Sequence, residues 1–283
     1  MLYLILAILC SVAVSINLKL LKRYYTNAYQ TIVFNYPTAV ILCVLLFKPN
    51  FNSVPTSQYF VVYTVIALLM ISIFYFISKS IATAGIVRTA IAQRLSLIIP
   101  VLAAFLIFNE SINNLKIIGL VIGFVAIYTS IPSAGKSKTI SGSYWYPLIV
   151  FTGTGVIDIF FNMLTQFNGI PFTQSLFHIF CIATVFGMVS LLYQKTTGKL
   201  KLQTKAMFAG IVLGILNFGS IYFYIKALAT ESSRPSVIFS ALDIGVIALG
   251  SLVGLVLFKE RLSGFNKFGL LLAIIAICIL TFA

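Results

Sequence analysis

Long apolar stretches almost free of charge run through this sequence from beginning to end. A helix that spans a bilayer needs about 20 apolar residues. Only 8% of the 283 residues are charged and 60% are hydrophobic, whereas about a quarter of the residues of a soluble domain are charged. The sequence therefore predicts an all-α integral membrane protein with ten transmembrane helices, joined by short loops. The predicted helices cover residues 2–21, 29–47, 59–78, 84–108, 115–131, 146–165, 172–193, 206–228, 235–258 and 266–282.

The net charge of +14, from 19 basic and 5 acidic residues, would favour nucleic-acid binding in a soluble chain. Here most basic residues fall in loops between apolar stretches, where they face lipid headgroups and bias the orientation of the chain. We therefore expect membrane lipid, and no nucleic acid, as the partner of this charge. By the positive-inside rule, the loop charges place both termini outside.

Metal, cofactor and ATP chemistry have no support in the sequence. The four cysteines lie singly inside apolar stretches, without metal-ligand or redox spacing, and such cysteines behave as small hydrophobic side chains. The sequence also lacks the glycine-rich loop with lysine that binds nucleotide phosphates. We expect no cofactor, no metal and no ATP-driven pumping by this chain. The cysteines are Cys10, Cys43, Cys181 and Cys278.

The two halves of the chain resemble each other. A gapless offset of 150 residues aligns the ends of the halves, and the offset falls slightly towards their beginnings, as small loop insertions would require. The chain is therefore predicted to be a tandem duplication, with a five-helix repeat over 1–131, a polar linker over 132–144 and a second five-helix repeat over 145–283. Matched pairs include Glu110 with Glu260, Gly119 with Gly269, Asn17 with Asn162 and Gln30 with Gln174.

An odd number of spans in each repeat has a topological consequence. The second repeat must enter the membrane from the side opposite to the first, which predicts an inverted repeat. Inverted repeats are typical of secondary transporters, because the two halves can exchange their packing and so open a central site to either side of the membrane.

Residues 94–128 and 246–280 carry a further resemblance. Each reads as an apolar helix, a Glu followed by a short polar turn (NESINN at 109–114, KERLSG at 259–264) and a Gly-containing apolar helix. This block resembles the repeat of the EamA-type branch of the drug/metabolite transporter superfamily. One departure is the first span, which reads SVAVSIN over 11–17 where the family often has a Trp-Gly pair.

The resemblance implies two inverted five-helix repeats, with spans one to four and six to nine around a central cavity and spans five and ten packed outside it. It also implies that both termini lie inside, opposite to the charge bias, so the orientation stays open. Substrates in the family include amino acids, nucleotide sugars, sugar phosphates and drugs.

Ionisable residues inside apolar stretches mark candidate functional sites, because a charge at mid-membrane is costly without a partner or water. Arg94, Asp158, His178 and Asp243 are in this position. The repeat aligns Gln93 with Asp243, which places Arg94 and Asp243 at comparable depth and predicts an ion pair between them. The pair could be static, or it could bind or gate the substrate.

Polar faces on three predicted helices extend this candidate site. Asp158 and Asn162 share a face of the sixth span, Asn17 is the repeat partner of Asn162, and Gln93 lies on a polar face that ends at Pro100. We expect Pro100 to kink its helix or to free a carbonyl. The predicted cavity residues are Asn17, Gln93, Arg94, Asp158, Asn162 and Asp243. Hydrogen bonding between helices is the alternative role for such side chains.

Proton coupling and helix capping are further roles that the sequence offers for its ionisable residues. Asp158, Asp243 and His178 are candidates for gating or proton coupling, but the lone His178 also fits a satisfied donor between helices. Glu110 and Glu260 each follow an apolar stretch, where a carboxylate can cap the N-terminus of the next helix. We expect these two glutamates to mark the fold rather than the substrate.

The sequence thus favours a secondary transporter rather than an enzyme. We expect an exporter of small polar or amphipathic metabolites, amino acids or related compounds, in a bacterial plasma (inner) membrane, as a monomer or homodimer. An alternative function is exchange of sugar phosphates or nucleotide sugars. An intramembrane lipid-modifying enzyme or a scramblase is a third class, but such an enzyme needs convergent acid, base or metal ligands.

Overall fold

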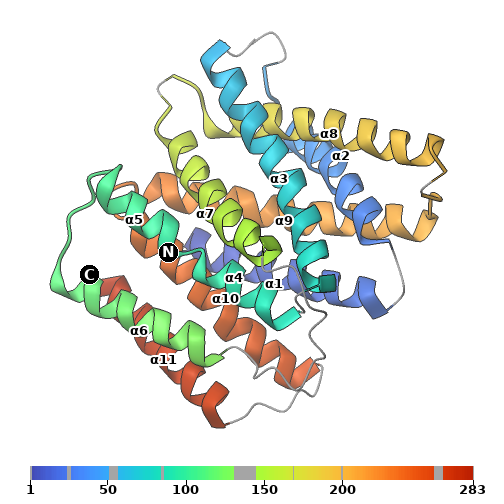
Figure 1. The fold of residues 1–283 in the computed structure, drawn as a ribbon. Coiled ribbons are helices and arrows are strands. Elements are labelled where there is room, and N and C mark those ends of the chain that lie inside the picture. The colour runs from blue at the N-terminus through green and yellow to red at the C-terminus, as the bar shows by residue number, and fades with distance from the viewer. Residues whose placement is uncertain are drawn as a thin grey trace.

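The computed structural model describes residues 2–23, 27–50, 57–83, 86–130, 145–167, 169–198, 200–257 and 264–282, and all regular structure in these ranges is α-helical (Figure 1). The helices are α1 (Leu2–Arg23), α2 (Ala28–Phe47), α3 (Ser57–Thr83), α4 (Ile86–Leu95), α5 (Ile98–Leu106), α6 (Asn114–Ser130), α7 (Trp145–Thr165), α8 (Phe172–Thr196), α9 (Thr204–Thr230), α10 (Pro235–Leu257) and α11 (Gly264–Phe282).

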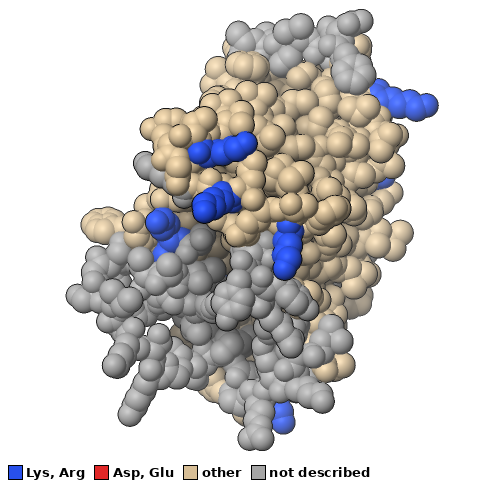
Figure 2. Space-filling model, turned by 90° about the vertical axis from the view of Figure 1, so that its right-hand side faces the viewer, with Lys and Arg blue, Asp and Glu red and all other residues tan. Residues whose placement is uncertain are grey.

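Five helical segments are long and apolar enough to cross a membrane: α2, residues Gln58–Ile77 of α3, α7, α8 and α9. The remaining helices contain shorter apolar segments. On the face drawn in Figure 2, the described residues are mostly uncharged and the charged ones in view are Lys or Arg. Many large apolar side chains are also exposed, among them Leu106, Phe208 and Val256. An all-helical fold with this surface is compatible with a membrane protein.

The predicted fourth span, 84–108, is two helices rather than one. α4 ends at Leu95 and α5 begins at Ile98, because Pro100 has no N–H to donate to the Ser96 carbonyl and its ring displaces that carbonyl. The Ser96 carbonyl accepts a hydrogen bond from the Ile99 N–H instead, at 2.9 Å. The expected effect of Pro100 is therefore confirmed, and the predicted span consists of two helical segments.

α6 and α11 lie side by side (Figure 1), and glycines allow their close approach. A Cβ atom added at Gly119 would lie 2.8 Å from Leu280 Cγ of α11, and one added at Gly123 would lie 2.6 Å from Ile244 Cδ1 of α10. Both contacts are closer than real Cβ atoms tolerate. The close packing expected for the Gly119–Gly123 pair is therefore present.

α9 packs along α1 and α2, while α3 packs along α7 and α8. On α9, a Cβ added at Gly210 would lie 2.8 Å from the Thr31 carbonyl oxygen of α2, and one at Gly214 would lie 2.8 Å from that of Asn35. In addition, α7 packs against α4, α5 and α9, and α10 packs against α1, α5 and α9. The candidate site lies among these helices.

Candidate functional site

Arg94 and Asp243 form the predicted ion pair. Arg94 Nη1 lies 2.7 Å from Asp243 Oδ1, and the two side chains are 27% and 17% exposed. Arg94 lies in the last turn of α4, next to the break before α5, where a cation is favoured by the partial negative charge of a helix C-terminus. The prediction of an ion pair between α4 and α10 is confirmed, and its role stays open at this point.

Asp158 of α7 joins the same group. The Tyr224 hydroxyl of α9 donates a hydrogen bond to Asp158 Oδ1 at 3.1 Å. Asp158 is also close enough to Arg94 and Asp243 for their charges to interact. We call Arg94, Asp158, Tyr224 and Asp243 the charged cluster, which joins helices α4, α7, α9 and α10.

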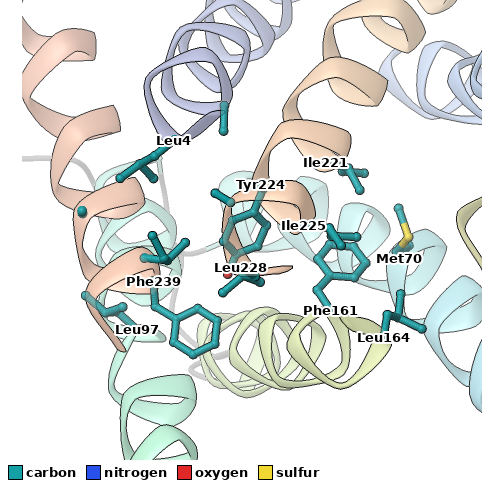
Figure 3. Packing of buried hydrophobic residues seen from close by; sticks show 14 of the residues in the cluster. Leu4, Met70, Leu97, Phe161, Leu164, Ile221, Tyr224, Ile225, Leu228 and Phe239 are labelled. Atoms are coloured by element: carbon teal, nitrogen blue, oxygen red, sulfur yellow. The ribbon is translucent and has the colours of Figure 1, made fainter. Parts of the chain in front are cut away.

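The charged cluster lies within the helix bundle rather than on its outer surface. The residues of α10 from Pro235 to Gly250 and those of α7 from Gly153 to Thr165 are all buried or half-buried. The Tyr224 ring lies between Phe161 of α7 and Phe239 of α10 (Figure 3), and both rings meet it edge-on, at centroid distances of 6.3 and 6.4 Å. These three rings form an apolar wall at the Tyr224 side of the cluster.

Two predicted cavity residues hold polar atoms without a partner. Asn162 is 1% exposed and its Nδ2 has no hydrogen-bond partner among the described residues, and the same holds for the buried Oδ1 atom of Asn17. A buried amide left unpaired costs about 1–3 kcal/mol. Asn162 follows Asp158 by one helical turn, so both side chains lie on one face of α7. That Asn17 and Asn162 face a shared space stays a prediction.

The hydroxyl groups on the polar face predicted for the fourth span form hydrogen bonds within the span and to α3. The Ser96 hydroxyl donates to the Gln93 carbonyl at 2.6 Å, and Thr89 shares a hydrogen bond with Ser80 of α3 at 2.7 Å. The Gln93 side chain is half-buried. These contacts agree with the alternative that hydroxyls here serve packing, and they leave the predicted substrate role of Gln93 open.

His178 has contacts that fit a structural donor. Its Nδ1 lies 2.8 Å from the Gln174 carbonyl oxygen one turn earlier, and its ring stacks on Tyr63 of α3 at a centroid distance of 5.7 Å. Phe177 meets the same ring edge-on. These contacts join α8 to α3, away from the residues of the charged cluster. They favour the role of a satisfied donor, while proton coupling by His178 stays a prediction.

Glu110 caps a helix, but a different one from the helix expected. Its Oε2 accepts the backbone N–H of Ser236 at 2.8 Å and its Oε1 accepts the Ser236 hydroxyl at 2.6 Å, at the start of α10. The following helix, α6, is capped by Asn113, whose Oδ1 accepts the Lys116 N–H at 2.7 Å. Because Asn113 fills that position, the carboxylate turns to α10. Glu260 lies outside the described residues.

Lys116 is a buried partner of Glu110 rather than a loop residue at the headgroups. Lys116 Nζ lies 3.0 Å from Glu110 Oε1 and donates to the Ser111 carbonyl at 2.7 Å. The two side chains are 2% and 0% exposed. We call Glu110, Ser111, Lys116 and Ser236 the α10 anchor. Spacing along the chain suggested that Glu110 caps a helix, but it held no signal for the burial of Lys116.

Three comparisons with known proteins extend these observations. No protein-family model matches the chain. An uncharacterized protein of Haemophilus influenzae is 38% identical over 282 residues, which is 97% of this chain and 95% of that protein. A solved structure, described only as "Crystal structure of protein", has a TM-score of 0.72 and 14% identity, and the match covers 99% of this chain and 98% of that one. The chain therefore shares a fold that occurs in a solved structure.

Proposed function

We propose that this chain, which belongs to the same protein family as the uncharacterized protein of Haemophilus influenzae, is a secondary transporter that works by alternating access. The observation that carries the proposal is the charged cluster. Arg94, Asp158 and Asp243 come from three helices and meet inside the bundle, next to the break between α4 and α5. Transporters commonly bind substrate at broken helices between two repeats.

The proposal includes ten spans, with α4 and α5 counted as one broken span, arranged as two inverted repeats. The helices α2 and α8, which the repeat matches, pack against each other in opposite directions. Tyr29 near the start of α2 bonds Ser190 near the end of α8, at 2.5 Å. Asn50 just past the end of α2 bonds Gln174 near the start of α8, at 3.0 Å. Antiparallel packing of matched helices supports inversion.

Two glutamines matched by the repeat make equivalent contacts, which is a second support. Gln30 Nε2 donates to the Lys201 carbonyl at 2.6 Å, and its Oε1 accepts the Gln203 N–H at 2.9 Å. Gln174 Nε2 donates to the Asn50 carbonyl at 3.0 Å, and its Oε1 accepts the Asn50 N–H at 3.0 Å. Each carboxamide thus holds the main chain between the second and third helices of the other half.

We further propose that the cargo is a small polar or amphipathic metabolite, an amino acid or a related compound, exported across a bacterial plasma membrane. The resemblance of residues 94–128 and 246–280 to the EamA-type repeat favours such cargo. The aromatic wall of Phe161, Tyr224 and Phe239 beside the charged cluster suits a cargo with both apolar and charged parts.

Counterflow in proteoliposomes tests the proposal. Vesicles with the purified chain are loaded with unlabelled amino acids, nucleosides or sugar phosphates, and uptake of the labelled compound is followed. We expect saturable exchange of amino acids that Asp158→Ala abolishes and the control Glu231→Gln leaves unchanged, since Glu231 pairs with Arg234 at the surface. Exchange of sugar phosphates alone would favour the alternative cargo. Absence of saturable exchange for all three classes would reject transport.

A further inference from the structure

When all three side chains are ionised, the charged cluster has an excess of negative charge. Arg94 and Asp243 neutralise each other at 2.7 Å. The side-chain hydrogen bond that the structure gives Asp158 comes from the uncharged Tyr224 hydroxyl. A carboxylate within a helix bundle is costly unless a positive charge balances it. The cluster therefore contains two carboxylates and one guanidinium, and Asp158 is the carboxylate that no described cation contacts.

The nearest basic residue along α9 does not balance Asp158. Lys226 follows Tyr224 by two residues, so the two side chains point to different sides of the helix. Lys226 Nζ lies 3.1 Å from the Tyr222 hydroxyl and 4.5 Å from the centroid of the Tyr3 ring. Its charge is thus held at the contact of α9 with the start of α1. Among the side chains that the structure describes, no second cation balances an ionised Asp158.

A second observation at the same place points to a ligand. Asn162, one turn after Asp158 on α7, is 1% exposed and its Nδ2 donor has no acceptor among the described residues. Such a donor is rarely left unpaired inside a protein unless a ligand or water accepts from it. Tyr224, whose hydroxyl bonds Asp158, carries a ring that Phe161 meets edge-on, and aromatic faces attract organic cations.

We propose that Asp158 binds the ammonium group of a protonated amine. In this arrangement the Asp158 carboxylate balances the ammonium charge, Tyr224 orients the carboxylate, and the Asn162 amide donates to an acceptor elsewhere on the same ligand. The Arg94–Asp243 pair stays intact as the neutral neighbour. The inference rests on the proposed function in taking this amine as cargo, but binding of the amine can be measured without transport.

The test compares three ligands of similar shape on the full chain purified in detergent: 2-phenylethylammonium, 2-phenylethanol and 3-phenylpropionate. A ligand that binds the folded state raises its melting temperature in a saturable way. We expect a saturable rise with the ammonium compound alone. The rise should disappear in Asp158→Asn, which keeps the shape and loses the charge, and remain in Glu231→Gln, which removes a surface carboxylate.

Several results would overturn the inference. These are no rise in the wild type, an equal rise with the alcohol, or a rise that survives in Asp158→Asn. If Asp158→Asn does not fold, Asp158→Glu replaces it. Moving the carboxylate by one methylene should weaken amine binding about tenfold, because a charged hydrogen bond depends on its geometry, and unchanged affinity would contradict the assignment.

Failure of this inference can be told apart from failure of the proposed function. Saturable counterflow without amine-specific stabilisation would keep the transporter and reject the ammonium site. Amine-specific stabilisation that depends on Asp158, without counterflow of the bound amine, would keep the site and reject transport.

Discussion

The α10 anchor joins the start of α10 to the α5–α6 loop and to α6, and the charged cluster joins the middle of α10 to α4. The two sites differ in charge balance and access. In the anchor, Glu110 is matched by Lys116 and bound by Ser236, and the two charged side chains are 0% and 2% exposed. In the cluster, Arg94 and Asp243 are 27% and 17% exposed, and Asp158 adds a further carboxylate.

This difference indicates a structural role for the α10 anchor and, in our proposal, a binding role for the charged cluster. The Glu110 carboxylate is fully buried and its charge is already balanced by Lys116, so it offers a ligand neither access nor an unbalanced charge, and the anchor holds the start of α10 in place. In the charged cluster, no second cation balances an ionised Asp158, and Arg94 and Asp243 are partly exposed. The cluster can therefore accept one positively charged group. A carboxylate therefore serves the fold at Glu110, beside the start of α10, and in our proposal binds the cargo at Asp158 of α7.

The largest effect on stability is expected at the anchor. Lys116→Met leaves the buried Glu110 carboxylate without its cation, which should lower the free energy of unfolding by about 3–5 kcal/mol. Thermal unfolding in detergent measures the loss. The double variant Lys116→Met with Glu110→Gln removes both charges and should recover most of it. A loss under about 1 kcal/mol in the single variant would show that the anchor is not a structural unit.

A smaller loss of stability, with complete loss of exchange, is expected at the ion pair. Arg94→Met leaves Asp243 without its partner, and the cost should be about 1.5–3 kcal/mol because the pair is partly exposed. Counterflow and thermal unfolding are measured together. The swap of Arg94→Asp with Asp243→Arg should fold better than either single change. No recovery in the swap would contradict the pairing.

The next largest loss of stability is expected where α7 packs against the break between α4 and α5. A Cβ at Gly155 would lie 2.6 Å from Ile99 Cβ and 2.9 Å from the Ser96 carbonyl oxygen, whereas one at Gly250 would have no described atom of another helix within 4 Å. Gly155→Ala should therefore destabilise by about 1–3 kcal/mol and reduce exchange by displacing Asp158. Gly250→Ala should leave both unchanged or add slight stability. Equal effects would argue against close packing at the break.

The smallest effect is expected at Tyr224. Tyr224→Phe removes one hydrogen bond to Asp158 and keeps the ring, so the cost should be about 1 kcal/mol, with amine binding retained but weakened. Tyr63→Phe removes a comparable bond to Ser175, at 2.8 Å, and serves as the control with normal binding. Identical binding in the two variants would show that Tyr224 does not orient Asp158.

Much of the helix layout could be predicted from the sequence, because apolar length determines which segments can be long helices. The Arg94–Asp243 pair could also be predicted, since the repeat places two costly charges at the same depth. The position and length of the break between Leu95 and Ile98 could not be predicted. The sequence shows that Pro100 weakens a helix, but it does not show where the first helix ends and the second begins.

Contacts that depend on how each helix is rotated about its axis could not be predicted from the sequence. Tyr224 and Asp158 are 66 residues apart, and no spacing rule relates the faces of α7 and α9. Glu110 was correctly predicted to cap a helix, but its choice of α10 depends on Asn113 occupying the start of α6. The burial of Lys116 follows from that choice. Local patterns therefore identified these groups, while tertiary packing selected their partners.

The central claim is that Asp158 binds the amine that the protein transports. Counterflow of labelled 2-phenylethylamine into loaded proteoliposomes tests it most directly, because it measures whether exchange of an amine depends on the Asp158 carboxylate. We predict saturable exchange by the wild type and by Glu231→Gln, and none by Asp158→Asn at a melting temperature close to that of the wild type. Exchange by Asp158→Asn at the wild-type rate would contradict the account.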